Sequence, residues 1–213
     1  MTVREKLELL DLYDELTSLN FRQREVLKRL SYDNNSFIRG LTASLLVKTV
    51  NRDVMNILFR LAFDKCEYVR IEAYDSLSEF EYKEVVDFLK NALQNEKSNL
   101  AKSYAITSFA EVVFKLNLCD CYSALFSELL ATEKSKLCRI SYLYGLHLFG
   151  EDNLDKILFY LDDEDYYVRF AVLSVIEELL DDKNKDLIFR QLNERLSVEK
   201  CPSVKDRITK LVS

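Results

Sequence analysis

Apolar and polar residues follow one another along the chain with the period of amphipathic α-helices. The segment Val54–Leu61 carries apolar residues at the i, i+3, i+4 and i+7 positions, which lie on one stripe of a helix. The same spacing recurs in Val85–Ala92, Tyr122–Leu129 and Leu154–Leu161. After a short polar corner, each stripe is followed by a second apolar pattern. The chain is therefore predicted to be a series of helix–corner–helix units.

The second pattern surrounds a basic residue that recurs six times, at intervals of 31, 32, 37, 30 and 36 residues. The residues one before, three after and seven after it are apolar, except for Thr42. The six basic residues are Arg39, Arg70, Lys102, Arg139, Arg169 and Lys205. A period of 30 to 40 residues is typical of solenoids, in which each unit packs only on its neighbours.

The two patterns predict an amphipathic helix over residues 3–18 and six helix pairs. The pairs are expected at 21–31 and 36–50, 52–62 and 66–80, 82–94 and 98–116, 120–131 and 135–149, 152–161 and 165–180, and 185–196 and 202–212. We expect one solenoid domain over residues 1–213, with residues 1–19 as an N-terminal cap and residues 20–213 as six repeats.

The corners carry residues that begin and end helices. Asp64 and Glu67 have the spacing of a capping box. Pro202 suits the first position of a helix, and Gly150 is expected to end one. Gly40 is expected to allow a neighbouring helix to approach closely. Further candidate N-caps are Ser36, Ser98, Ser135 and Asp163.

The segments Val69–Leu77 and Tyr167–Val172 resemble the second helix of HEAT-like repeats, in particular the short bacterial repeats named after phycobilisome lyases. The resemblance covers about residues 20–212 and implies an all-α, right-handed α-α superhelix. It also implies that corner carboxylates pair with the repeated basic residue. Candidates are Asp33, Asp64 and the cluster at residues 162–165, with Glu96 and Glu133 less clear. We expect the basic residues to be structural, bonding corner carbonyls and carboxylates of their own or the preceding unit, rather than to bind phosphate.

Composition narrows the classes of function. Three glycines and one proline favour helices over tight hairpins, and the net charge of −6 disfavours nucleic acid and anionic membranes as partners. Five cysteines and the single His147 form no metal-binding spacing, so neither metal nor cofactor is expected. No apolar run approaches the length of a signal peptide or a membrane span, and we expect a cytoplasmic protein.

The second helices of such stacks line the concave side, and positions two, five, six and nine after the basic residue should point away from the core. In the middle of the stack these positions include several carboxylates together with Tyr104 and Tyr144, and charge beside aromatic residues is common in interfaces. The candidate partner-binding residues are Glu72, Asp75, Glu79, Tyr104, Glu111, Tyr144 and Glu178. The alternative is an ordinary solvated helix face.

These observations predict a non-catalytic scaffold that binds a basic protein partner on the concave face. One alternative is an immunity protein that inhibits a toxin, because an acidic protein suits a basic toxin. A second alternative is an enzyme similar to the HEAT-like alkylpurine DNA glycosylases, but these use a basic groove with tryptophan, and this chain has no tryptophan. A lyase or lyase-like chaperone is a third alternative, for which no distinctive nucleophile is present.

Overall fold

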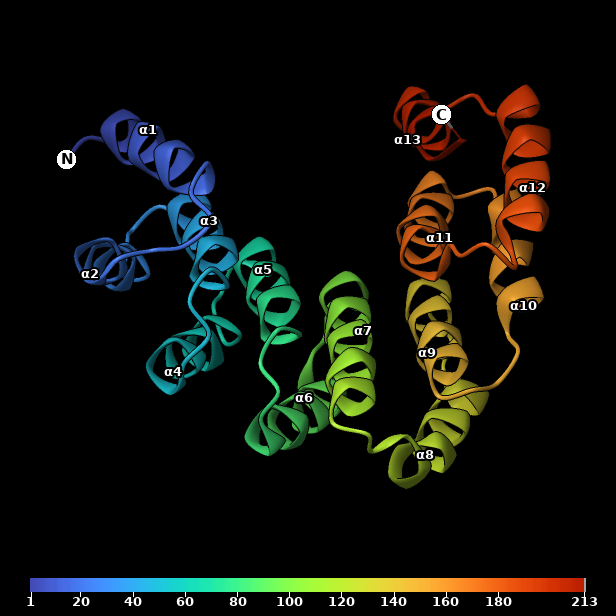
Figure 1. The fold of residues 1–213 in the computed structure, drawn as a ribbon, viewed down its shortest axis with the longest axis horizontal. Coiled ribbons are helices and arrows are strands. Elements are labelled where there is room, and N and C mark those ends of the chain that lie inside the picture. The colour runs from blue at the N-terminus through green and yellow to red at the C-terminus, as the bar shows by residue number, and fades with distance from the viewer. Residues whose placement is uncertain (213) are drawn as a thin grey trace. The chain divides into compact units, whose positions relative to one another are not determined.

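The structure, a computed structural model, describes residues 1–212, and no strand occurs in that range (Figure 1). The prediction of an all-α fold built from helix pairs is confirmed. The α-helices are α1 (Val3–Asp14), α2 (Phe21–Leu30), α3 (Ser36–Leu46), α4 (Arg52–Leu61), α5 (Glu67–Leu77), α6 (Lys83–Asn95), α7 (Asn99–Lys115), α8 (Cys119–Thr132), α9 (Lys136–Leu148), α10 (Leu154–Leu158), α11 (Tyr166–Leu179), α12 (Lys185–Val198) and α13 (Pro202–Val212). A short 3-10 helix, η1 (Phe159–Asp162), continues α10.

The chain forms two compact units, one from Met1 to Cys119 and one that begins at Asp120. In the first unit, α3, α5 and α7 lie side by side in one layer, and α2, α4 and α6 form the other (Figure 1). In the second unit, α11 packs between α9 and α13, and α12 packs on α13. A single domain over residues 1–213 stays a prediction, and residue 213 lies outside the described residues.

The apolar frame around the repeated basic residues forms the core of both units. The residues one before and three after each basic residue are at most 3% exposed, as the periodicity predicted. Thr42, the polar exception, is buried and donates its hydroxyl to the carbonyl of Ile38, one turn earlier. A buried hydroxyl needs such a partner, and a helix offers one at i−4. The second helices therefore supply much of the core of each unit.

Helix α1 packs on α3 and buries Leu10 and Tyr13. It ends at Asp14, four residues earlier than predicted. The ammonium group of Lys48 in the segment after α3 donates to the carbonyls of Tyr13 at 3.2 Å and Leu16 at 2.8 Å, and to that of Asp14. A cation that satisfies the last carbonyls stabilises a helix end. A contact across about 35 residues of sequence therefore sets the end of α1.

The N-terminal caps follow the prediction at Ser98 and Ser135, whose hydroxyls accept from the amides of Ala101 and Cys138. Pro202 is the first residue of α13, also as predicted. Other caps were wrong by one or two residues. The α3 cap is Asn35 instead of Ser36, and the α11 cap is Asp165 instead of Asp163.

The capping box at Asp64 and Glu67 is also wrong. The residue before α5 is Cys66, whose side chain makes no capping bond, and Asp64 instead accepts from the Cys66 amide at 2.9 Å. The Asp64 carboxylate is turned toward Arg39, as described below, and Glu67 accepts from the hydroxyl of Ser98. A longer-range cation has therefore replaced the local cap.

Gly150 ends α9 as predicted. Its φ of +99° is a left-handed conformation that glycine adopts without strain. The Gly150 amide donates to the His147 carbonyl and the Glu151 amide to the Leu146 carbonyl, each at 3.0 Å. These two bonds form a Schellman motif, which satisfies the last carbonyls of the helix.

Candidate functional site

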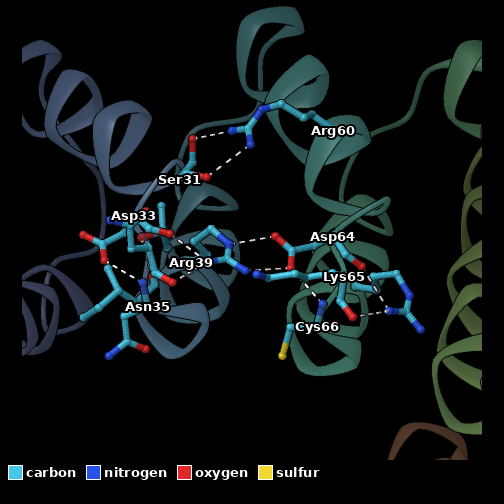
Figure 2. A network of polar contacts seen from close by, with 12 residues as sticks. Ser31, Asp33, Asn35, Arg39, Arg60, Asp64, Lys65 and Cys66 are labelled. Atoms are coloured by element: carbon cyan, nitrogen blue, oxygen red, sulfur yellow. Dashed lines mark hydrogen bonds and ion pairs between the residues drawn. The ribbon is translucent and has the colours of Figure 1, made fainter.

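The repeated basic residues bond to the corners between helices. Arg39, in the first turn of α3, donates through Nε and Nη2 to the two carboxylate oxygens of Asp64, each at 2.7 Å (Figure 2). Its Nη1 donates to the carbonyls of Asp33 at 2.7 Å and Asn34 at 3.2 Å. One planar guanidinium thus joins its own corner to the next, with the bidentate geometry that makes arginine–carboxylate pairs strong.

Two other arginines repeat this arrangement. Arg70 makes the bidentate pair with Glu96 at 2.7 and 2.9 Å, and its Nη1 donates to the Asp64 carbonyl at 3.0 Å. Arg169 pairs with Glu199 at 2.7 Å through both bonds and donates to the Asp163 carbonyl at 2.7 Å. The same three bonds therefore occur in both units.

The direction of these pairs differs from the prediction. The carbonyls belong to the arginine's own corner, but the carboxylate belongs to the following helix pair, not to the arginine's own or the preceding one. The reason is geometric, because a side chain in the first turn points back toward the helix N-terminus. Its Nη1 then meets its own corner, and the opposite edge of the guanidinium faces the next one.

Glu199 was missed by the sequence reasoning, although a signal for it exists. A carboxylate stands six residues before every repeated basic residue: Asp33, Asp64, Glu96, Glu133, Asp163 and Glu199. Each accepts a hydrogen bond of 2.7 to 3.0 Å from the backbone amide two residues later. The carboxylates therefore order the corners as well as joining the helix pairs.

The remaining basic residues vary. Arg139 donates to the hydroxyl of Tyr160 at 3.1 Å and to the carbonyls of Leu130 and Glu133, also at 3.1 Å. The cation on Asp163 is instead Lys136, at 2.6 Å. Two of the six repeated basic residues are lysines. Lys102 is half-buried, and Lys205, in α13, is exposed. In the first unit, Lys6 of α1 takes the place of an arginine and pairs with Asp33.

The electrostatics of the buried pairs agree with their geometry. Burial by itself raises the pKa of the Glu199 carboxyl, but hydrogen bonds from Arg169, from Arg195 and from the amides of Cys201 and Lys200 outweigh it and hold that pKa at about 2. Burial also opposes ionisation of Asp64, yet bonds from Arg39 and from the Cys66 amide lower its pKa. These groups are engaged in holding helix pairs together.

Three of the candidate partner-binding residues lie on neighbouring helices of the first unit: Glu72 and Asp75 on α5, and Tyr104 on α7. We call them the acidic face. Asp75 and Tyr104 are exposed, and Glu72 is half-buried. Burial raises the pKa of Tyr104, and the negative charges of Asp75 and Glu72 raise it further, so the three groups interact. These three side chains therefore lie close together on neighbouring helices, and their role in partner binding stays a prediction.

Glu72 is the most perturbed carboxylate of this surface. Burial, followed by the charge of Asp75, raises its pKa to about 7, although a hydrogen bond with Tyr68 opposes the rise. A half-buried carboxylate beside a second one is held in an environment that disfavours its charge. A cation placed here would relieve that cost.

Replacing Glu72 with Gln should therefore stabilise the protein at alkaline pH. The folded pKa of about 7 exceeds the ordinary 4.5, so the stability contribution of this group is lost as the pH rises from 4.5 to 7. With allowance for solvent screening, we expect Glu72→Gln to raise the free energy of unfolding by about 1 kcal/mol at pH 8 and little at pH 5. Urea denaturation at both pH values measures this, with the exposed Glu25→Gln as control. A Gln variant less stable than wild type at pH 8 would contradict it.

Tyr68 and Phe37 extend the acidic face and were not in the predicted set. Their rings stack with centroids 5.8 Å apart. Gly40 admits the Tyr68 ring, because a Cβ at this position would lie 2.1 Å from Cε1 of Tyr68. The close approach predicted for Gly40 is therefore confirmed. The sequence signal was an aromatic residue two positions before the basic residue in two successive units.

Two other candidates of the first unit are less available. Glu79, at the end of α5, accepts from the ammonium group of Lys115 at 3.0 Å. Lys115 also donates to the carbonyl of Ser78 at 2.9 Å, which fixes the pair at the C-terminal end of α5. Glu111 on α7 is half-buried. Glu79 is thus paired within the unit, whereas Glu72 and Asp75 lie next to each other on α5.

The prediction that Tyr144 is an exposed anchor is wrong. Tyr144 is 3% exposed and belongs to the apolar core of the second unit, together with Ile140 and Leu143 of the same helix. Helix α9 is buried over more of its circumference than α5, so the position that is exposed at Asp75 is covered at Tyr144. Glu178 lies on α11 of the second unit and is exposed.

Residues 1–212 offer little further site chemistry. No group of three or more histidine, cysteine, aspartate or glutamate side chains in this range could hold a metal ion. None of the described helices has the length and apolar character needed to cross a membrane. His147 accepts a hydrogen bond from the Asn153 amide at 3.3 Å near the end of α9.

Residues 24–110 match the family model of HEAT repeats. The match runs from α2 to α7 and contains Arg39, Arg70 and the whole acidic face. This part of the first unit is therefore similar to HEAT repeats, a class of helical solenoids that commonly acts as protein-interaction scaffolds. No curated protein matches the chain.

Proposed function

We propose that the protein is a non-catalytic interaction scaffold whose acidic face binds a basic segment of a partner protein. The observation that carries the proposal is Glu72, a half-buried carboxylate next to Asp75 whose pKa is about 7. A lysine or arginine of a partner would favour the charged form of Glu72. The rings of Tyr68 and Tyr104 would offer further contacts to the same cation.

The internal pairing of the repeated arginines supports this choice of surface. Arg39, Arg70 and Arg169 each hold a corner carboxylate, so these cations and anions largely neutralise one another inside the stack. Asp75 is exposed on α5 and Glu72 is half-buried beside it, so a cation of a partner can approach both. Likeness to HEAT repeats favours protein binding, and the phycobilisome-lyase subtype, the concave placement and the immunity role stay predictions.

Charge reversal at the acidic face tests the proposal. The probe is a fluorescent peptide of alternating lysine and alanine, with a glutamate–alanine peptide as its counterpart. We expect Glu72→Lys combined with Asp75→Lys to weaken binding of the lysine peptide about tenfold or more at low salt, because like charges then meet. Fluorescence anisotropy at two salt concentrations measures the loss, which should shrink as salt screens the charges.

The matched control reverses two exposed glutamates of the same unit that lie outside the acidic face, Glu25 on α2 and Glu81 before α6. It changes the net charge by the same amount. If Glu25→Lys with Glu81→Lys weakens binding as much as the acidic-face variant, net charge rather than this surface governs capture, and the proposal fails.

A further inference from the structure

A cavity of about 370 Å³ lies in the first unit, on the layer formed by α2, α4 and α6. It opens between the corner that follows α4 and the C-terminal half of α6, with α5 beneath it. Phe63, Phe88 and Ala92 form apolar walls, Tyr74 lies beneath, and Asp87 brings a carboxylate to it. Arg70 and Lys97 also line it, and the Glu96 carboxylate there is already held by Arg70. Its volume is at the small end of the range of about 300 to 1,000 Å³ for ligand pockets. The cavity therefore suits one side chain rather than a large ligand.

Comparison of successive repeats explains why the cavity exists. Four residues before the corner carboxylate stands Arg60 in α4 and Arg195 in α12, but Ala92 in α6, Leu129 in α8 and Phe159 in η1, and of these alanine has the smallest side chain. Both arginines reach back to the residue that directly precedes the previous corner carboxylate. The guanidinium of Arg60 lies 3.7 Å from the ring centroid of Tyr32, and Arg195 lies 3.5 Å from the carboxylate of Asp162. The side chain of Ala92 is too short to make such a contact, so the cavity beside it stays open.

The residue that this missing side chain would meet is Phe63, the counterpart of Tyr32. Phe63 is 76% exposed, so most of its side chain is open to solvent. It contacts Phe88 edge-to-face with centroids 5.7 Å apart. Arg60 makes a second contact beside Tyr32, because it also donates to the Ser31 carbonyl at 3.2 Å (Figure 2).

The cavity beside Ala92 offers groups that correspond to those that Arg60 contacts. The Ala62 carbonyl takes the place of the Ser31 carbonyl, and it accepts only a 3.3 Å bond from the Tyr74 hydroxyl among the described side chains. A carbonyl oxygen can accept two hydrogen bonds. The carboxylate of Asp87 is exposed at the rim. An aromatic face, a carbonyl and a carboxylate together match a planar guanidinium better than an ammonium group.

We propose that this cavity receives an arginine side chain of a partner protein, which stacks on Phe63 as Arg60 stacks on Tyr32. The cavity lies on the α4 and α6 layer and the acidic face lies on α5 and α7, so the two sites bind through different residues. The cavity site extends the proposed function and does not depend on it.

The test uses the full-length chain and three acetylated, amidated pentapeptides with glycine on both sides of arginine, lysine or citrulline. Binding is followed by amide chemical shifts in NMR spectra of the labelled protein. We expect the arginine peptide to shift the amides of residues 62–64 and 91–97 and to bind several-fold more tightly than the other two. Phe63→Ala should weaken binding about fivefold, which corresponds to one exposed cation–π contact.

Ala92→Arg supplies the missing side chain from the protein itself and should abolish binding of the arginine peptide. Gln94→Arg, an exposed position of α6 outside the cavity, adds the same charge and should leave binding unchanged. Equal losses in both variants would overturn the proposal. So would shifts confined to residues 72, 75 and 104, a result that favours the acidic face alone. Tighter binding of free L-arginine than of the peptide would overturn a protein segment as the occupant.

Discussion

Replacing Arg169 with Met is expected to lower the free energy of unfolding by about 3 kcal/mol. The change removes both 2.7 Å bonds to Glu199, whose carboxylate is fully buried, and keeps a side chain of similar length. Arg195 and two backbone amides still hold Glu199, which places the loss at the lower end of the range for a broken buried pair. Urea denaturation followed by far-ultraviolet circular dichroism measures it.

The matched control is Arg139→Met in the same unit. Arg139 donates to the Tyr160 hydroxyl and to two carbonyls, which are neutral acceptors, so we expect a loss of about 1–2 kcal/mol. The two variants should also differ in acid. Glu199 stabilises the fold above its ordinary pKa of 4.5, and this contribution is lost as the pH falls toward about 2. Arg169→Met should flatten that dependence, and an unchanged acid profile would count against the pair.

Gly40→Ala should destabilise the protein, although the same change in most helices is stabilising by about 1 kcal/mol. The new Cβ would lie 2.1 Å from the ring of Tyr68, so the ring must move away. Overpacking of this kind costs about 1–3 kcal/mol, and we expect a net loss of about 1–2 kcal/mol. The displaced Tyr68 ring would also disturb its hydrogen bond with Glu72 at the acidic face.

A double-mutant cycle separates the clash from any other effect of the alanine. In a Tyr68→Ala background the ring is absent, and Gly40→Ala should then be neutral or stabilising by up to about 1 kcal/mol. The coupling between the two positions is expected to be about 1–3 kcal/mol in thermal or urea unfolding. The same loss of stability in both backgrounds would show that a clash between residue 40 and the Tyr68 ring is not its cause.

The acidic face illustrates how far helical periodicity reaches. The spacing from the repeated basic residue predicted that Glu72, Asp75 and Tyr104 share a surface, and the structure places them on neighbouring helices. The same rule failed at Tyr144, because the rule gives a direction around one helix and not what covers that direction. The same rule did not predict Tyr68, because the position of its ring depends on the space left by Gly40 on another helix.

The cavity near Phe63 depends on one residue that differs between repeats. The alignment of Arg60, Ala92 and Arg195 is present in the sequence, but an alanine in a helix has no evident meaning by itself. Only the observed contact of Arg60 with Tyr32 shows which group is missing beside Phe63.

From the sequence alone follow the all-α class, the boundaries of most helices and the burial of the apolar frame. These properties depend on residues a few positions apart, for which local geometry imposes the period. The tertiary structure decided that the arginines hold the following corner, that Glu72 is held with a pKa of about 7, and that a cavity remains beside Ala92. Each of these results depends on helices that pack together although their residues are far apart in the chain, and no local spacing determines that packing.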